Sequence, residues 1–429
     1  MDKNRVEDLI IVGGGIMGLF TAYYASQYSK NVIILEKRTV GNKFSASSGY
    51  SRSIRNDYLD PYYSCLSAES QKMWRELEKI SGKKFIIKNG CFNIAKKDVT
   101  PNLSQTYAEQ SYKILKKLGF ITKYFKNKQS LKSSYPQFDA DIGCVDVDAG
   151  FLYIPVIMSL LKKLLRKRGI KIYENSEVVG IKEVDENVVI KTNKGKIYKA
   201  KSVNLSVGVW ALEVLSKIDK AGWLKLPIIP IEQQLDYFSV PKNERELFSY
   251  KKMPVFAYLD VGIYGHPLYK KSPGLKVAYF DPMGAKLTKS VFSPEIQNKI
   301  NNNFDFIRQC FPDIKDVKIV KQEFNYYDMI PDNNFIIDQL PGFKNIFIAG
   351  GFCGTGFKFA PIIGKIMAEK ILRKSSIYDT SKFSAKRFGK INDLSFLKTI
   401  PMYLNFFRPR NWKYLKKGIE AIFLLKKMP

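Results

Sequence analysis

The chain opens with a sharp change in the spacing of its hydrophobic positions. Residues 9–12 read LIIV, an apolar run typical of a buried strand, and GGGIMG follows directly. A stretch with helical periodicity comes next, and a second apolar run, NVIIL, ends at Glu36. This order predicts a strand–helix–strand unit with parallel strands.

The glycines of this unit have a spacing suited to a dinucleotide. Gly13, Gly15 and Gly18 form GxGxxG, which lets the backbone approach a pyrophosphate at the start of a helix. Glu36 stands where a carboxylate binds the ribose. Two alternatives stay open: a glycine-rich turn in an unrelated α/β fold, and a solvated charge at Glu36. The long polar stretch after the unit favours FAD over NAD.

The rest of the chain alternates between two kinds of pattern. Residues 151–215 return to long helical and strand-like runs, and FIID, NIFIAGG and FAPIIGKIMAEKIL predict two strands and a helix. Short alternating runs in 225–330 predict an antiparallel sheet. We therefore expect two domains and an extension. The FAD-binding domain takes 1–85, 151–215 and 331–375, the substrate domain takes 86–150 and 216–330, and the extension takes 376–429.

Composition narrows the function classes. The 429 residues carry a net charge of +30, which fits an acidic surface, an anionic substrate or plain compositional bias. The charge is spread out and no nucleic-acid-binding signature occurs, so no nucleic-acid partner is predicted. Five scattered cysteines and one histidine, His266, offer no metal-ligand spacing. The charged start and the lack of about 18 consecutive apolar residues predict neither a signal peptide nor a membrane span.

The extension differs from the body in composition. From Lys382 onward it holds 12 basic and 2 acidic residues, interleaved with aromatic and leucine side chains. That pattern is typical of a segment on an anionic membrane surface. A helix packed on the body and a subunit contact are the alternatives. We expect a cytoplasmic protein, with peripheral contact at the inner face of the membrane as one hypothesis.

Two cationic motifs indicate an anionic ligand. SASSGYSRSIRNDY contains Arg52 and Arg55, and on a helix that spacing would put both guanidiniums on one face. A solvated basic face is the alternative. In GFCGTGFKFAP, Lys358 lies between two phenylalanines, and a lysine is rarely buried without a partner.

Taken together, these motifs resemble a known flavoenzyme family. GGGIMG, SGYSRSIR, YGHPLYKKSPGLK and FIIDQLPGFKNIFIAGGFCGTGFKFAP resemble, in order and spacing, monomeric sarcosine oxidase and N-methyltryptophan oxidase of the D-amino-acid-oxidase group, over about residues 8–375. The resemblance implies a mixed α/β fold of the glutathione-reductase and D-amino-acid-oxidase type. It has a Rossmann-like FAD-binding domain and an antiparallel-sheet substrate domain.

The resemblance also implies roles for individual residues. Arg55 and Lys358 match the pair that holds the substrate carboxylate, and Lys276 matches a lysine that promotes reaction with O2. Arg52 and Tyr264 match active-site residues near the flavin. The positions expected to bind FAD are Gly13, Gly15, Ile16, Met17, Gly18, Glu36, Lys37, Ser47, Ser48, Val178, Val179, Gly208, Trp210, Gly354, Thr355, Gly356, Phe357 and Lys358.

Some positions depart from the family pattern. Where the family often attaches FAD through a cysteine, this chain has Asn325 or a close neighbour, so non-covalent FAD is predicted. Cys353 is interpreted as a small core thiol. Serine near Ser48 and Phe280 replace histidines, which argues against sarcosine itself as the substrate.

The leading hypothesis is oxidation of the C–N bond of a primary or secondary amino acid to an imine, with O2 reduced to H2O2. One alternative is a dehydrogenase that passes electrons to a membrane quinone or another carrier. Others are a biosynthetic enzyme that oxidises a cyclic amine and a non-catalytic flavoprotein.

Overall fold

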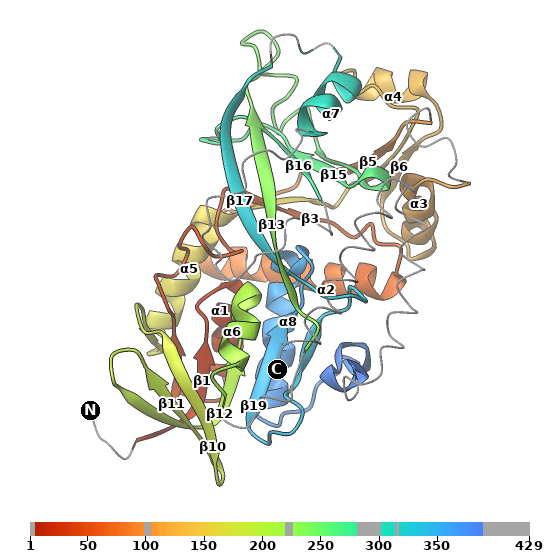
Figure 1. Cartoon of the computed structure of the whole chain (residues 1–429). Helices are drawn as coiled ribbons and strands as arrows, with labels where there is room; N and C mark the ends of the chain where they lie inside the picture. The colour runs from red at the N-terminus through yellow and green to blue at the C-terminus, as the bar shows by residue number, and fades with distance from the viewer. Residues whose placement is uncertain are drawn as a thin grey trace, which may run out of the picture.

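The computed structural model describes residues 5–97, 104–218, 226–280, 302–312, 314 and 317–388. Three sheets organise this part of the chain. In Figure 1 the sheet with β1 lies in the lower half and the sheet with β16 in the upper half, and the long strands β13 and β17 run between the two.

The parallel sheet forms as the hydrophobic pattern predicts. Its strand order is β9-β2-β1-β12-β19-β18, and all neighbours are parallel except the last pair. The first half of β12 also pairs with the antiparallel strand β11, which in turn pairs with β10. The strands are β1 (Val6–Val12), β2 (Val32–Leu35), β9 (Lys171–Tyr173), β10 (Val178–Val184), β11 (Asn187–Thr192), β12 (Ile197–Leu205), β18 (Ile336–Gln339) and β19 (Ile346–Gly350).

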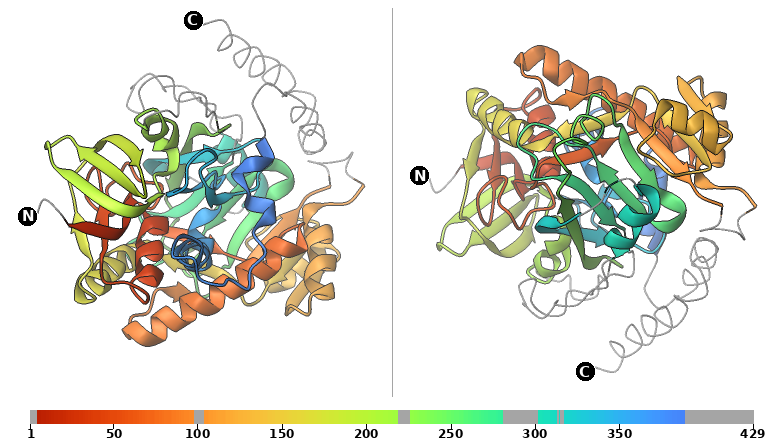
Figure 2. Two further views of the ribbon diagram at one scale, coloured as in Figure 1. Left: turned by 90° about the horizontal axis from the view of Figure 1, so that it is seen from below. Right: turned by 90° about the horizontal axis from the view of Figure 1, so that it is seen from above.

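Helices cover one face of this sheet. Their apolar faces share a continuous core with the sheet, with Leu9, Phe20, Trp74 and Ile363 at its centre. A second core lies on the other face, between the sheet and β10–β11. The left view of Figure 2 shows α1 and α2 on one side and β10–β11 on the other. The helices are α1 (Ile16–Ala25), α2 (Pro61–Ser81), α5 (Ile154–Lys167) and α8 (Ala360–Ile371).

The mixed sheet has the order β17-β13-β16-β15-β14-β5-β7-β6 and is antiparallel except between β14 and β5. Its strands are β5 (Cys91–Ala95), β6 (Thr122–Phe125), β7 (Ile142–Asp146), β13 (Ile229–Phe238), β14 (Val255–Tyr258), β15 (Ile263–His266), β16 (Leu275–Tyr279) and β17 (Ile319–Met329). The helices α3 (Tyr107–Lys117), α4 (Lys128–Ser134) and α7 (Asn302–Cys310) belong to the same region. The predicted domain boundaries remain a prediction.

A small sheet contains the two arginines. It consists of β3 (Ser51–Ile54), β8 (Gly150–Tyr153) and β4 (Ile86–Ile87) in the order β3-β8-β4. The helical interpretation of the arginine pair is therefore wrong, because Arg52 lies in a strand and Arg55 directly follows it. Successive strand residues point to opposite faces, so a spacing of three separates the two guanidiniums.

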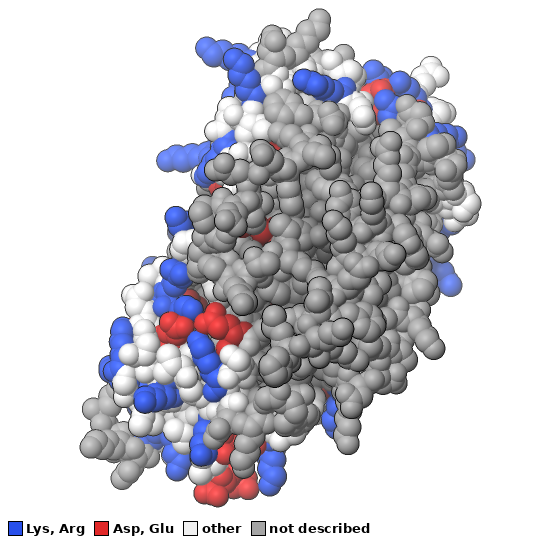
Figure 3. Space-filling model, viewed as in Figure 1, with Lys and Arg blue, Asp and Glu red and all other residues white. Residues whose placement is uncertain are grey.

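The charges on the surface and the length of the helices bear on the predicted membrane contact. On the described part of the face in Figure 3, Lys and Arg side chains are scattered widely, while the larger groups of acidic side chains lie in the lower half. In the described parts of the chain, no helix is long and apolar enough to cross a membrane. The predicted membrane contact falls mainly on residues 389–429, which lie outside the described residues.

Candidate functional site: a dinucleotide cleft beside a buried cluster of cations

Two positions in and after the turn between β1 and α1 require glycine. Gly13 has φ +104°, and a Cβ there would lie 2.4 Å from the carbonyl oxygen of Ser206. A Cβ on Gly18 would lie 2.0 Å from the carbonyl oxygen of Gly13, because α1 packs closely on the strand end. This close packing brings the start of α1 to the carboxyl edge of the parallel sheet.

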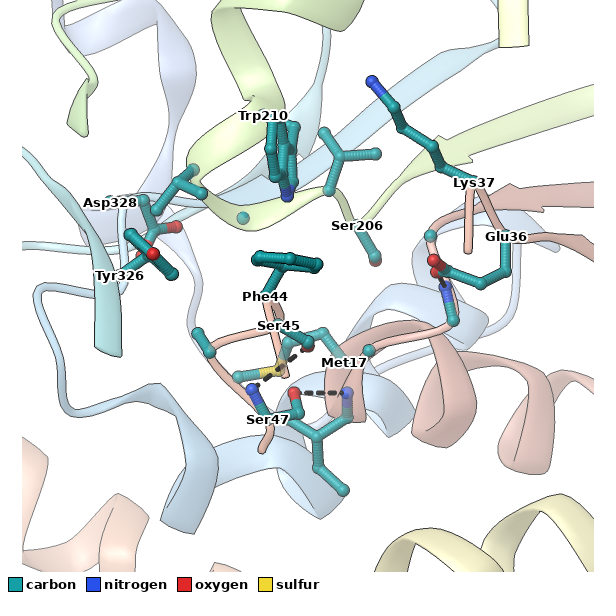
Figure 4. A pocket seen from close by; sticks show the side chains of 18 of the residues that line it. Met17, Glu36, Lys37, Phe44, Ser45, Ser47, Ser206, Trp210, Tyr326 and Asp328 are labelled. Carbon is teal, nitrogen blue, oxygen red and sulfur yellow. Dashed lines mark hydrogen bonds between the residues drawn. The ribbon is translucent and has the colours of Figure 1, made fainter. Parts of the chain in front are cut away.

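Two side chains hold this turn in place (Figure 4). The Glu36 carboxylate, at the end of β2, accepts hydrogen bonds from the backbone N–H groups of Gly14 (2.6 Å) and Arg38 (2.8 Å). The Ser47 hydroxyl oxygen accepts a bond from the Ile16 N–H at 2.9 Å. Both side chains face the cleft.

The cleft has a volume of about 1300 Å³, including its open mouth. The predicted cofactor residues that line it are Gly13, Gly15, Ile16, Met17, Glu36, Lys37, Ser47, Val178, Gly208, Trp210, Gly354, Gly356 and Phe357. Five others are absent from the lining: Gly18, Ser48, Val179, Thr355 and Lys358.

The expected role of Val179 is corrected by the structure. Val178 is buried and faces the cleft, whereas the Val179 side chain is 41% exposed. The two residues are neighbours on β10, so their side chains point to opposite faces of the strand. Of the two side chains, only that of Val178 is placed to contact a ligand in the cleft.

The residues present fit FAD. The glycine turn admits a pyrophosphate at the N-terminus of α1, where helix N–H groups favour negative charge. Glu36 stands beside this turn, at the position suited to ribose hydroxyls. At the cleft mouth Lys37 pairs with Glu177 (3.0 Å) and Glu213 (3.2 Å) and lies over the Trp210 ring.

Arg52 belongs to the wall of this cleft. Its guanidinium donates to the carbonyl oxygens of Ser51 (2.9 Å), Ala46 (2.9 Å) and Ser48 (2.7 Å), and to the side-chain oxygen of Asn325 at 3.2 Å. Asn325 lies on β17, so a residue at or near the position predicted to match the family's cysteine bonds to Arg52 in this structure.

Arg55 lies outside the lining of the cleft and has an internal partner. One guanidinium nitrogen donates to the Asp57 carboxylate at 2.6 Å and to the Asp57 carbonyl at 2.9 Å. Burial raises the pKa of Asp57, and the neighbouring Arg55 opposes that rise. The predicted clamp therefore contains an acidic residue that sequence reasoning missed. Its position two residues after Arg55 was the available signal.

Lys358 is buried next to this ion pair. Its ammonium group donates to the carbonyl oxygen of Thr355 at 3.1 Å and lies 5.8 Å from the Tyr58 ring centre. Burial lowers the pKa of Lys358 to about 7, and Arg55 adds to this while Asp57 opposes it. Among the described residues, Asp57 is thus the acidic side chain whose charge acts on Lys358.

The remaining predicted residues lie on the mixed sheet. Lys276, on β16, donates to the Ser51 carbonyl at 3.2 Å, and burial followed by the charge of Arg52 lowers its pKa to about 7. The Tyr264 and Tyr327 hydroxyls are 3.0 Å apart. Burial raises the pKa of Tyr264 well above its ordinary value, so this hydroxyl stays protonated.

His266 is buried on β15, beside Lys276 on β16. Its Nε2 lies 3.0 Å from the Ser53 hydroxyl, and burial, reinforced by Lys276, lowers its pKa well below the ordinary value. His266 and Lys276 join the mixed sheet to β3.

Comparisons with known proteins agree with this geometry. A protein-family model described as "FAD dependent oxidoreductase" matches residues 8–370. "Peroxisomal sarcosine oxidase" of Homo sapiens is 27% identical over 404 residues, covering 90% of this chain and 97% of the relative. "N-methyl-L-tryptophan oxidase" of Escherichia coli (strain K12 / DH10B) is 27% identical over 395 residues, covering 89% and 99%. Glycine oxidase from Geobacillus kaustophilus has the same fold, with a TM-score of 0.73, 19% identity and coverage of 89% and 98%.

Proposed function

Because this chain belongs to the family of FAD-dependent oxidoreductases, we propose that it oxidises the C–N bond of a primary or secondary amino acid to an imine and reduces O2 to H2O2. The membership itself confirms the predicted fold class, FAD cofactor and enzyme class. Relatives named sarcosine oxidase and N-methyl-L-tryptophan oxidase support an amino-acid donor.

The observation that carries the proposal is the pair of buried cations beyond β3. Arg55 and Lys358 come from distant parts of the chain and meet around the Tyr58 ring. Buried cations are costly unless an anion compensates them, and Asp57 supplies only one negative charge. A substrate carboxylate supplies the second. A hydrogen bond between charged groups contributes about 1.5–3 kcal/mol, enough to favour amino acids over simple amines.

The chain's own residues bind, orient and exclude water. Lys358 and Arg55 hold the carboxylate, and Tyr264 presents a protonated hydroxyl. Bound FAD supplies the two-electron acceptor for the donor's C–N bond. Lys276 places positive charge beside β3, where it favours the negative charge that develops as O2 is reduced. The glycine turn, Glu36, Ser47 and Arg52 hold the cofactor, non-covalently in our proposal.

The test is anaerobic mixing of the holoprotein with N-methyl, cyclic, D- and L-amino acids, followed by admission of air. Loss of the visible flavin absorbance with one amino acid, and its rapid return in air, is the expected result. Absence of flavin reduction by every amino acid would refute the proposal.

A dehydrogenase is the second candidate, and the basic, aromatic extension favours it because such a segment suits contact with a membrane carrying a quinone. Slow reoxidation in air with fast reoxidation by a soluble quinone would support it. We also propose that the protein is cytoplasmic and that residues 376–429 contact the membrane surface. Co-sedimentation with anionic vesicles, compared with a chain ending at 388, tests that contact.

A further inference from the structure

Several buried polar atoms next to Arg55 have no hydrogen-bond partner among the described residues. They are Oδ2 of Asp57, Oδ1 of Asp146, and both the nitrogen and the oxygen of the Asn93 side-chain amide. All three side chains are 1% exposed. Buried polar groups in native proteins are almost always paired. Four unpaired atoms on three neighbouring side chains thus leave hydrogen-bonding capacity that a ligand next to Arg55 can use.

Strand register places these atoms on one patch. Cys91 pairs with Asp146 and Asn93 pairs with Cys144 between β5 and β7, so all four side chains share one face of the mixed sheet. Asp57 lies over this face. After burial, its charge is the largest contribution that raises the pKa values of both Cys91 and Cys144. The neighbouring Asn56 donates its N–H to Asp146 at 2.7 Å.

Asp57 is the acidic group that pairs with Arg55, and its charge also opposes the lowering of the pKa of Lys358. Asp146 lies near Asp57, and burial followed by the charge of Asp57 raises its pKa to about 7. Asp57 already occupies one nitrogen of Arg55. A second anionic group on a substrate would therefore meet unpaired carboxylate oxygens, whereas a nitrogen donor would satisfy them.

We propose that Asp57 is a specificity-determining residue, and that with Asn93 it receives a cationic, nitrogen-bearing side chain of the substrate. The inference rests on the proposed function and deepens it: the substrate is an amino acid with a second amino group, and dicarboxylic amino acids are disfavoured. Asn93 is the independent indication, because its amide is fully buried, unpaired and on the patch that Asp57 covers.

The experiment uses carboxylic acids that lack an α-amine and so have no C–N bond next to the carboxylate that the enzyme could oxidise. The holoprotein is titrated with 5-aminopentanoate, pentanoate and glutarate, which have equal chain length, and the shift of the flavin absorbance gives each Kd. We expect 5-aminopentanoate to bind at least about tenfold more tightly than glutarate, the effect of one charged hydrogen bond. Asp57→Asn should remove this preference.

Two further variants complete the test. Asn93→Leu keeps the Arg55–Asp57 ion pair and should weaken 5-aminopentanoate while leaving pentanoate unchanged. Asp148→Asn, a carboxylate paired with Lys88 at the surface, should behave as the unaltered protein. Equal binding of glutarate and 5-aminopentanoate would overturn the proposed role of Asp57 but not the carboxylate clamp. A preference for 5-aminopentanoate that persists in Asp57→Asn would do the same. Failure of all three acids to bind overturns the carboxylate clamp, and the proposed function with it.

Discussion

Replacement of Lys358 by methionine provides the sharpest test of the carboxylate clamp. Methionine fills a similar volume without charge. Lys358 is 6% exposed, and its ammonium group bonds to the Thr355 carbonyl. Loss of one charged hydrogen bond costs about 1.5–3 kcal/mol, so the Kd of a carboxylate should rise about 10- to 150-fold.

The pH dependence of carboxylate binding distinguishes the contribution of Lys358 from the contributions of other residues. Its pKa in the free protein is lowered to about 7, mainly by burial and then by Arg55. The group is charged below that pKa, so carboxylate binding is tightest in the acidic range. Above it the Kd should rise by about tenfold per pH unit until the pKa of the complex is reached.

The assay is titration with pentanoate between about pH 6 and about pH 9, read from the flavin absorbance. Lys358→Met should bind weakly and show little pH dependence. Lys276→Met is the control, because the pKa of Lys276 is also about 7 but its ammonium group faces Ser51. If the slope persists in Lys358→Met and vanishes in Lys276→Met, Lys276 binds the carboxylate and our assignment is wrong.

Three further outcomes follow from the same geometry. Folding lowers the pKa of Lys276 and Lys358, so the unfolded chain binds more protons than the folded chain above about pH 7. The free energy of unfolding, measured in urea, should therefore rise from about pH 7 to about pH 10. A free energy that does not change over this range would contradict the burial of the two lysines. Gly13→Ala should yield colourless protein, because its Cβ would meet a backbone oxygen at 2.4 Å, whereas Gly180→Ala, with 3.8 Å of room, should stay yellow. Acid precipitation should release all flavin into the supernatant, since Asn325 offers no thiol; flavin retained in the pellet would mean a covalent bond elsewhere.

Local patterns were sufficient to predict the cofactor half of the molecule. Strand, glycine turn, helix and acidic residue follow one another within Leu9–Glu36, and each is set by neighbours in sequence. Gly13 and Glu36 therefore lie where the pattern indicated. The resemblance extended this prediction to Trp210 and Phe357, which line the same cleft although they come from distant segments.

The contacts of the buried cations could not be predicted from the sequence in the same detail. The family resemblance predicts that Arg55 and Lys358 hold the substrate carboxylate. The partner of Arg55, however, depends on how the chain turns after β3. Asp57 bonds to Arg55 only because the turn brings its carboxylate back to the guanidinium. Asn93 carries no motif, and its place beside Asp57 follows from the register of β5 with β7.

The two arginines show how a change of secondary structure alters the chemistry. On a helix, Arg52 and Arg55 would add two positive charges to one chamber. In the extended segment of β3 and the residue that follows it, their side chains diverge: Arg52 lines the dinucleotide cleft and Arg55 enters the buried cluster with Asp57. One short segment thus supplies one cation to the dinucleotide cleft and one to the buried cluster. In our proposal the buried cluster binds the substrate, and its charge depends on Asp57, which pairs with Arg55, and not on Arg52.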